Sequence, residues 1–251
     1  MFSLSGKTAL VTGGSRGIGG ATTRLLARCG ADVIVHYRSR RDVAEAMVGE
    51  VVAMGRRAMA LPAQLSDRGA VDAMFAKVQE AWGGLDLFVA NAGIWPEDDV
   101  AVADMPDARW ARTVAENIDG MFYSTRGALR VLRDGGRVVL VSSTAGQRGE
   151  SMHADYAASK GAMIAFTKSV AIEVAHRGIT VNSVAPGWVD TEMCEGAFAG
   201  EGRARVAAGI PVGRIATPAD IAAPIVFLCA DEARHVTGEI VNVNGGSVLC
   251  G

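Results

Sequence analysis

The sequence predicts an α/β fold, a Rossmann-type doubly wound parallel β-sheet of about seven strands flanked by helices on both faces. Short apolar segments alternate with longer amphipathic ones along the chain, which is the pattern of repeated strand–helix units. The apolar segments are continuous, as expected for strands covered on both faces. A length of 251 residues fits one such unit, because α/β domains reach about 250 residues without dividing. We therefore expect a single domain over residues 1–251.

The first half of the chain supplies four strands and the helices between them. The first apolar segment enters a glycine-rich turn, after which a helix with one apolar side continues to Cys29. Gly30 stops this helix, and Gly83 with Gly84 stops a later one, since glycine readily takes the conformation that ends helices. The predicted strands are Thr8–Val11, Asp32–Tyr37, Arg57–Leu61 and Leu85–Ala90. The predicted helices are Gly19–Cys29, Asp42–Met54 and Gly69–Trp82.

The second half continues the alternation with three more strands, each after a helix. The predicted helices are Ala108–Leu132, Tyr156–His176 and Pro218–Asp231, and the predicted strands are Arg137–Ser142, Ile179–Val184 and Glu239–Val243. The least regular segment is Asp190–Gly209, which is rich in Gly, Ala and Glu. It follows the carboxyl end of a strand, where open α/β sheets bind ligands. We interpret it as a mobile substrate flap, with an ordinary variable surface helix as the alternative.

Charge and hydropathy exclude several classes of partner. The formal net charge is −2 and the basic clusters are short, so we expect no nucleic-acid partner. No leading segment resembles a signal peptide, and no apolar run reaches the roughly 20 residues of a membrane-spanning helix. We expect a cytoplasmic protein with no membrane segment.

The cysteines predict neither a metal site nor a disulfide framework. They are widely spaced and form no Cys-x-x-Cys pair. Such closely spaced pairs are the usual sign of metal sites and redox-active disulfides. Cys29 and Cys229 lie in apolar helical patterns and are expected in the core. The remaining two are Cys194 and Cys250.

A glycine-rich loop after the first strand predicts a dinucleotide site. Residues 12–19 read Thr-Gly-Gly-Ser-Arg-Gly-Ile-Gly and open the first helix. Glycines let the backbone approach a pyrophosphate, which the free N–H groups of a helix N-terminus attract. A tight turn without a ligand is the alternative. The candidate cofactor contacts are Gly13, Ser15, Arg16, Gly17, Ile18 and Gly19.

The end of the second strand favours NADP(H) over NAD(H). NAD-preferring sites often carry an acid there, which accepts a hydrogen bond from the ribose 2′-OH. Here the segment is Tyr37-Arg38-Ser39-Arg40-Arg41, without an acid. Arg38 and Arg16 could pair with a 2′-phosphate. NAD(H) remains the second choice, and a solvated basic turn is the alternative to any cofactor contact.

Tyr156 and Lys160 form a candidate acid–base pair. Residues four apart share one face of a helix, so the two side chains can be neighbours. A free tyrosine has a pKa near 10, and a nearby positive charge favours the phenolate. Ser143 lies thirteen residues upstream at a strand end. Ser142 is a competing candidate, and a strand-end serine can also simply satisfy the backbone.

These motifs together resemble the short-chain dehydrogenase/reductase family, and the match covers essentially the whole chain. In order they are the Thr12–Gly19 loop, Asn91-Ala92-Gly93, the set of Asn117, Ser143, Tyr156 and Lys160, and the segment Pro186–Thr191. The overall pattern is similar to that of 3-oxoacyl-carrier-protein reductases.

The resemblance implies a role for each of four residues. Tyr156 would exchange a proton with the substrate oxygen, and Lys160 would hold the nicotinamide ribose and lower the tyrosine pKa. Ser143 would polarise the carbonyl. Asn117 would hold a relay water through its backbone.

The resemblance also implies further cofactor contacts and an oligomer. The added contacts are Tyr37, Arg38, Ser39, Gln64, Leu65, Asn91, Ala92, Gly93, Tyr156, Lys160, Pro186, Gly187, Val189 and Thr191. Gln64 stands where many members carry an acid beside the adenine. By analogy with the family we expect a homotetramer or a homodimer.

The substrate is expected to be a small ketone or β-keto compound, or the corresponding secondary alcohol. Two positions that are basic in carrier-protein reductases fall here on Asp134 and Ile172, which weakens docking of an acidic carrier. Trp95 and Trp188 are candidates for the pocket wall. Two alternatives are a 3-oxoacyl-[acyl-carrier-protein] reductase and a non-catalytic nucleotide-binding scaffold.

Overall fold

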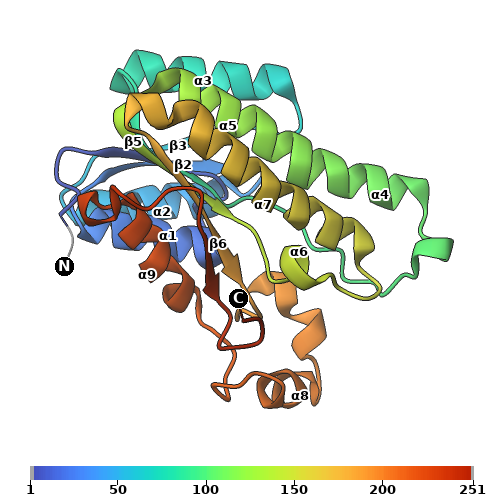
Figure 1. Cartoon of the computed structure of the whole chain (residues 1–251). Helices are drawn as coiled ribbons and strands as arrows, with labels where there is room; N and C mark the ends of the chain where they lie inside the picture. Colours follow the sequence, from blue (N-terminus) through green and yellow to red (C-terminus); the bar gives the residue numbers. More distant parts are fainter. Residues whose placement is uncertain (1–2, 250–251) are drawn as a thin grey trace.

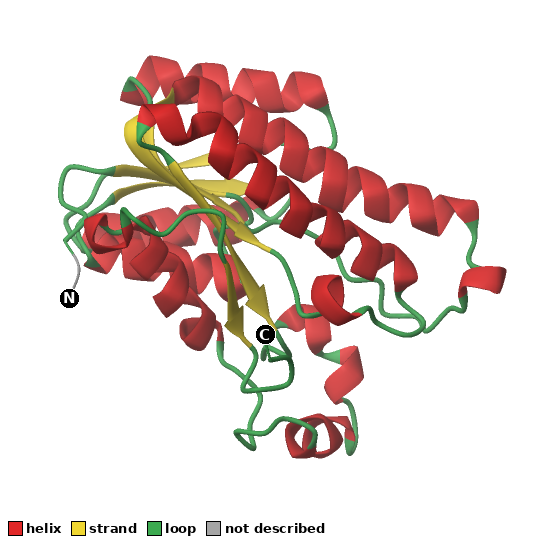
Figure 2. Cartoon of the chain, in the orientation of Figure 1, coloured by secondary structure: helices red, strands yellow, loops and turns green. Residues whose placement is uncertain are grey.

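The computed structural model describes residues 3–249 and shows one seven-stranded sheet with helices on both sides (Figures 1 and 2). The strand order is β3-β2-β1-β4-β5-β6-β7, and every neighbouring pair is parallel. This confirms the predicted doubly wound fold. The strands are β1 Thr8–Val11, β2 Asp32–Tyr37, β3 Ala58–Pro62, β4 Leu85–Ala90, β5 Leu132–Val141, β6 Thr180–Pro186 and β7 Ile240–Val243.

The longer helices form two layers, one on each face of the sheet (Figure 1). The layer on one face contains α1 Gly17–Arg28, α2 Arg41–Ala53 and α9 Pro218–Cys229. The other face is covered by α3 Arg68–Trp82, α4 Asp107–Val114, α5 Gly120–Val131 and α7 Ala154–Val174. Short helices α6 Ala145–Arg148 and α8 Gly202–Ala208 lie beyond the carboxyl ends of the strands.

Alternate strand residues point to opposite faces and so build two separate cores. Val11, Val33 and Val35 belong to the core under α1, α2 and α9, whereas Leu10 and Ile34 belong to the core under α3, α5 and α7. All five are fully buried. The predicted continuous apolar strands are therefore explained by burial on both faces. Cys29 and Cys229 are buried in the first core, as predicted, and Cys250 lies outside the described residues.

The predicted helix Ala108–Leu132 is interrupted in the structure. A π-helical turn, Ala115–Asp119, separates α4 from α5, and such turns are often found at functional sites. β5 begins at Leu132, five residues earlier than predicted, because Leu132 pairs with Leu85 before the register shifts. Boundary differences at the other long elements are at most two residues, the ordinary uncertainty of helix and strand ends.

The predicted flap Asp190–Gly209 has local structure. It contains two single 3₁₀ turns, Glu192–Cys194 and Gly196–Phe198, followed by α8. Asp190 is held by a bidentate ion pair with Arg203, at 2.7 and 3.0 Å. The segment is therefore helical rather than irregular, and its mobility stays a prediction.

His36 ties the glycine-rich loop to the sheet. Its Nδ1 accepts a hydrogen bond from the backbone N–H of Gly13 at 3.0 Å, and its Nε2 lies 3.0 Å from the carbonyl oxygen of Ala63. With Nδ1 accepting, the proton of the neutral ring is on Nε2, which donates to Ala63. Burial lowers the pKa of His36 to about 4. The ring is therefore neutral at pH 7 and connects the loop after β1 with the ends of β2 and β3.

We expect acid to destabilise the protein through His36. The folded-state pKa, about 4, lies below the ordinary value of 6.5, so between these values the unfolded chain binds a proton that the folded chain does not. Stability is unaffected by this group above pH 6.5 and falls as the pH drops toward 4. Unfolding by denaturant at pH 7.0 and 4.5 should show a loss about 2–3 kcal/mol larger in the wild type than in His36→Gln. Equal losses in both proteins would contradict the assignment.

Candidate active site

The site lies at the carboxyl ends of the strands, where the chain order reverses between β1 and β4. This is the position at which open α/β sheets bind ligands. A cleft of about 820 Å³ opens there. It is lined by the glycine loop, the ends of β2, β4, β5 and β6, the start of α7 and the segment after β6.

The glycine loop has the geometry of a phosphate cradle. Gly17 has a positive φ of 52°, which glycine adopts without strain. A Cβ on Gly19 would lie 2.1 Å from the carbonyl oxygen of Gly13, so no side chain fits between the loop and α1. The Ncap residue Arg16 makes no side-chain cap, which leaves the N-terminal N–H groups of α1 available to an anion. These features fit the pyrophosphate of a dinucleotide.

The arginines predicted to hold a 2′-phosphate both line the cleft, and both are paired with carboxylates. Arg16 pairs with Glu192 of the flap, and Arg38 Nη1 lies 3.4 Å from Glu116 Oε2. Each arginine side chain is 53% exposed, so neither pair is strong. Residues 38–41, directly after β2, contain no acid that would repel a phosphate. The two guanidinium groups therefore suit a phosphate monoester.

Gln64 is held beside the cleft by two hydrogen bonds. Its amide nitrogen donates to Ser66 Oγ at 2.6 Å and to Glu116 Oε1 at 2.7 Å. Leu65 lines the cleft, whereas Gln64 does not. These bonds fix the amide nitrogen, and the amide oxygen is the atom that could accept from an adenine amino group.

The segment Asn91-Ala92-Gly93 joins the ends of β4 and β1. Thr12 Oγ1 accepts hydrogen bonds from the backbone N–H groups of Asn91 and Ala92, at 2.9 and 3.0 Å. The Asn91 amide donates to the Thr12 carbonyl at 3.0 Å. All three residues of the segment line the cleft. The same is true of the predicted contacts Pro186, Gly187, Val189 and Thr191.

Ser143, Tyr156 and Lys160 meet on the floor of the cleft. Ser143 follows β5, and its side chain lies close enough to the Tyr156 phenol to lower the pKa of that group. The Lys160 ammonium lies over the Tyr156 ring, 5.7 Å from its centroid, and donates to the Val141 carbonyl at 2.9 Å. The sequence spacing therefore identified three side chains that are neighbours in space.

Burial dominates the electrostatics of this cluster. It raises the pKa of Tyr156 strongly, against a smaller lowering by the Ser143 hydrogen bond, and Glu150 and Cys194 raise it further. Burial also lowers the pKa of Lys160 to about 8. Both shifts favour the neutral form. The lowering of the tyrosine pKa that the resemblance implied for Lys160 is not found here: burial raises the pKa of Tyr156, and no lowering by Lys160 offsets it.

Asn117 is buried beside the cleft and does not line it. Its amide clamps the backbone of Ile94, accepting from the N–H at 2.8 Å and donating to the carbonyl at 2.9 Å. It also donates to Ser159 Oγ at 3.0 Å. The side chain thus fixes the segment after β4, while the π-helical turn that carries it lies against α7.

The substrate side of the cleft combines aromatic rings with acids. Trp95 stacks on His153 with centroids 4.7 Å apart and meets Trp188 edge-on at 5.9 Å. Trp95 Nε1 donates to Glu150 at 3.3 Å, and burial raises the pKa of that carboxyl. His153 is buried behind Trp95 and does not line the cleft. The thiol of Cys194 does, although the sequence offered no pattern that pointed to it.

Comparison with known proteins agrees with this geometry. Residues 13–247 match the family model described as enoyl-(acyl carrier protein) reductase. A 3-oxoacyl-[acyl-carrier-protein] reductase of Vibrio cholerae is 39% identical over 250 residues, which cover 99% of this chain and 100% of the relative. The corresponding reductase of Synechocystis is 36% identical over 252 residues, with the same coverage.

Solved structures of similar proteins share the complete fold. A short-chain dehydrogenase from Burkholderia cenocepacia in complex with NADP is 37% identical with a TM-score of 0.91, covering 97% of this chain and 98% of that one. A variant of a Serratia marcescens short-chain dehydrogenase/reductase is 34% identical with a TM-score of 0.92 and the same coverage. The glycine-loop cleft and its serine, tyrosine and lysine thus lie in a chain that belongs to the short-chain dehydrogenase/reductase family of oxidoreductases.

Proposed function

We propose that this protein is an NADP(H)-dependent oxidoreductase that interconverts a small ketone or β-keto compound and its secondary alcohol. The observation that carries the proposal is the cluster of Ser143, Tyr156 and Lys160 in a cleft that also contains the glycine loop. A bound nicotinamide cofactor would supply or accept the hydride. The protein then has to hold the substrate oxygen and move one proton.

Tyr156 is the proposed proton donor in carbonyl reduction. Its raised pKa keeps the phenol protonated at neutral pH, so the proton is in place when negative charge develops on the substrate oxygen. Ser143 would donate a second hydrogen bond to that oxygen. In alcohol oxidation the same tyrosine would act as the base.

Lys160 is proposed to bind the nicotinamide ribose and to help return the proton to Tyr156. A pKa of about 8 places its titration near neutral pH, so it can exchange protons in the working range. Asn117 would contribute through its backbone in the π-helical turn. These roles follow the family pattern and are consistent with the contacts described above.

NADP(H) is the proposed cofactor, with NAD(H) second. Arg16 and Arg38 line the cleft, and residues 38–41 directly after β2 contain no acid. Two similar structures were solved as complexes, one with NADP and one, a blue fluorescent protein from a metagenomic library, with NADPH. Cofactor contacts are proposed for the lining residues named above.

A 3-oxoacyl-[acyl-carrier-protein] reductase is the second candidate, because several full-length relatives carry that name. Two surface features favour a free substrate instead. Asp134 is ion-paired with Arg177 at 2.8 Å, and Ile172 is 81% exposed, so neither position offers a cation to an acidic carrier.

The location, oligomeric state and partners of the protein complete the proposal. No helix within residues 3–249 is long and apolar enough to cross a membrane. Over the same residues, no group of three or more His, Cys, Asp or Glu side chains could hold a metal ion. We propose a cytoplasmic protein that forms a homodimer or homotetramer and uses a small-molecule substrate without nucleic acid.

Replacing Tyr156 by Phe should abolish the reaction and spare cofactor binding. The phenol oxygen is the only atom removed, so turnover should fall by about 10²–10⁴-fold. NADPH oxidation with a panel of ketones, β-ketoesters and quinones measures turnover, and quenching of protein fluorescence measures NADPH binding. Tyr123→Phe, which removes a phenol outside the cleft, is the control. Near-normal turnover by Tyr156→Phe would refute the assignment.

Replacing Arg38 by Leu should reduce the preference for NADPH over NADH. Loss of one charge-assisted contact to the 2′-phosphate corresponds to about 1.5–3 kcal/mol, which is roughly a 10–100-fold change in the ratio of kcat/KM values. Arg41→Leu is the matched control, because Arg41 begins α2 outside the cleft and pairs with Glu45. A wild-type preference for NADH would overturn the cofactor assignment.

A carrier-linked substrate distinguishes the two candidate functions. We expect kcat/KM for a β-ketoacyl group on acyl carrier protein to be no higher than for the same group on a free pantetheine thioester, since the surface lacks cations at two docking positions. A higher value for the carrier-linked form, with strong dependence on salt, would support the carrier-protein reductase. Cofactor binding without turnover of any compound would favour a scaffold.

A further inference from the structure

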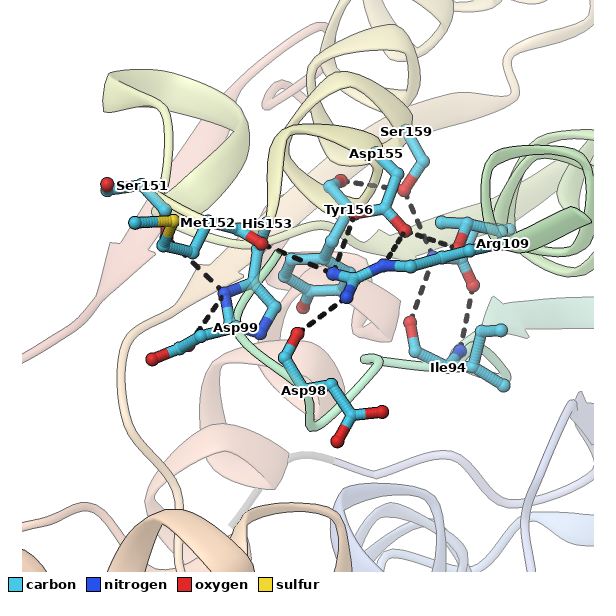
Figure 3. A network of polar contacts seen from close by, with 12 residues as sticks. Ile94, Asp98, Asp99, Arg109, Ser151, Met152, His153, Asp155, Tyr156 and Ser159 are labelled. Atoms are coloured by element: carbon cyan, nitrogen blue, oxygen red, sulfur yellow. Dashed lines mark hydrogen bonds and ion pairs between the residues drawn. The ribbon is translucent and has the colours of Figure 1, made fainter. Parts of the chain in front are cut away.

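Asp155 lies directly before the proposed proton donor and is completely buried. Its side chain is 0% exposed in the first turn of α7. A buried carboxylate requires partners, because desolvation of an unpaired charge is costly. The side chain of Arg109 reaches Asp155 from another helix, as Figure 3 shows.

Two residues of α4 hold this carboxylate. The Arg109 guanidinium binds both oxygens, with Nε 3.1 Å from Oδ2 and Nη2 3.2 Å from Oδ1, and Thr113 Oγ1 donates to Oδ2 at 2.7 Å. Arg109 and Thr113 are four residues apart and share one face of the helix. Burial alone would raise the pKa of Asp155, but these hydrogen bonds and the one from the Tyr156 N–H together lower it by more, so the net shift is downward. The pair is therefore ionised and neutral overall.

The other N–H groups of Arg109 hold two loops. Nη1 donates to the carbonyl of Asp98, and Nη2 also donates to that of Met152 at 3.3 Å. The Met152 carbonyl accepts a second bond from the Val100 N–H at 3.1 Å. Met152 has a φ of 66°, which is unusual for a residue with a side chain. The two hydrogen bonds to its carbonyl oxygen, from Arg109 and Val100, hold this conformation in place.

The two loops form part of the substrate wall. The loop of residues 94–100 contributes Ile94, Trp95 and Glu97 to the cleft, and the loop of residues 148–153 contributes Arg148, Gly149 and Glu150. Figure 3 shows the guanidinium of Arg109 between Asp98, Met152 and Asp155, with Tyr156 beside them. One side chain thus connects both loops to the helical turn that carries the proposed acid.

We propose that Arg109 and Asp155 are positioning residues, which orient Tyr156 and the two substrate-wall loops relative to each other. Neither residue lines the cleft, so they act through the groups they hold. The proposal rests on the proposed function, in which Tyr156 transfers the proton. Small displacements of a reacting group are expected to reduce turnover much more than cofactor binding.

The charge balance of the pair gives a test that loss of packing cannot imitate. Asp155→Asn leaves Arg109 with uncompensated positive charge, which favours the phenolate of Tyr156. Arg109→Met leaves a negative charge, which disfavours it. The groups that otherwise act on Tyr156 are Ser143, Lys160, Glu150 and Cys194, and all are unchanged in both variants.

The experiment measures alcohol oxidation with NADP against pH, because this direction requires the phenolate. We expect kcat to fall about 10–100-fold in both variants, with NADPH affinity within twofold of wild type. The rising limb of the pH profile should move to lower pH in Asp155→Asn and to higher pH in Arg109→Met. Arg109→Lys keeps the charge without the bidentate fork, so its profile should stay in place while kcat falls.

A matched control and a readout without turnover complete the test. Arg24 and Glu50 form another bidentate pair, at 2.5 and 2.9 Å, between α1 and α2. Arg24→Met and Glu50→Gln should leave kcat and the pH profile unchanged. The chain has three tyrosines, so NMR of protein labelled at tyrosine Cζ resolves Tyr156 by comparison with Tyr156→Phe. Its signal should shift or broaden in the Arg109 and Asp155 variants, while the signals of Tyr37 and Tyr123 stay unchanged.

The outcomes separate the two proposals. Folded variants with wild-type kcat, pH profile and Tyr156 signal would overturn the positioning role. Shifts of the pH profile in the same direction in both single variants would also overturn it. If the wild type turns over no ketone or alcohol, the proposed function fails, and the NMR comparison still decides whether the pair orients Tyr156.

Discussion

The site depends on how two neighbouring strands end. β1 and β4 lie side by side in the sheet, although almost 80 residues separate Thr12 from Asn91. The Thr12 hydroxyl accepts hydrogen bonds from two backbone N–H groups after β4. These bonds hold the carboxyl ends of β1 and β4 side by side. The segment after β1 forms the glycine loop, and the segment after β4 forms part of the substrate wall. The cleft between them follows from this junction.

Burial then sets the protonation of the groups that line the cleft floor. The low-dielectric surroundings disfavour charge on both Tyr156 and Lys160. A protonated phenol and a lysine that titrates near pH 8 suit proton donation to a carbonyl oxygen. Burial also keeps His36 uncharged, and its neutral ring holds the glycine loop through the Gly13 N–H.

Local patterns in the sequence were sufficient for the strands, the long helices and the spatial cluster of Ser143, Tyr156 and Lys160. The Tyr156/Lys160 spacing is a property of one helix, and the glycine loop is a property of one turn, so both can be inferred from neighbours in the chain. The π-helical turn at Asn117 was missed, because no residue pattern distinguishes it within a long helix. The hydrogen bond of Gln64 to Glu116 could not be predicted either, because the two residues are 52 apart in the sequence.

Contacts over long sequence distances explain most of what the sequence left open. Arg16 and Glu192 are 176 residues apart, and Arg109 and Asp155 are 46 apart. Charged residues of either sign are common on helices, so only the fold shows which ones meet. The substrate could not be predicted for the same reason, because three segments that are separate in the sequence form the wall of its pocket.

We infer that this cleft transfers a hydride between NADP(H) and a carbonyl carbon. Deuterium labelling measures this transfer: NADPH carrying deuterium at the transferable C4 position reacts with a ketone, and mass spectrometry analyses the alcohol. We expect one deuterium on the carbinol carbon and none from deuterated water at that carbon. A product without deuterium, or no product from a protein that still binds NADPH, would rule out this hydride transfer.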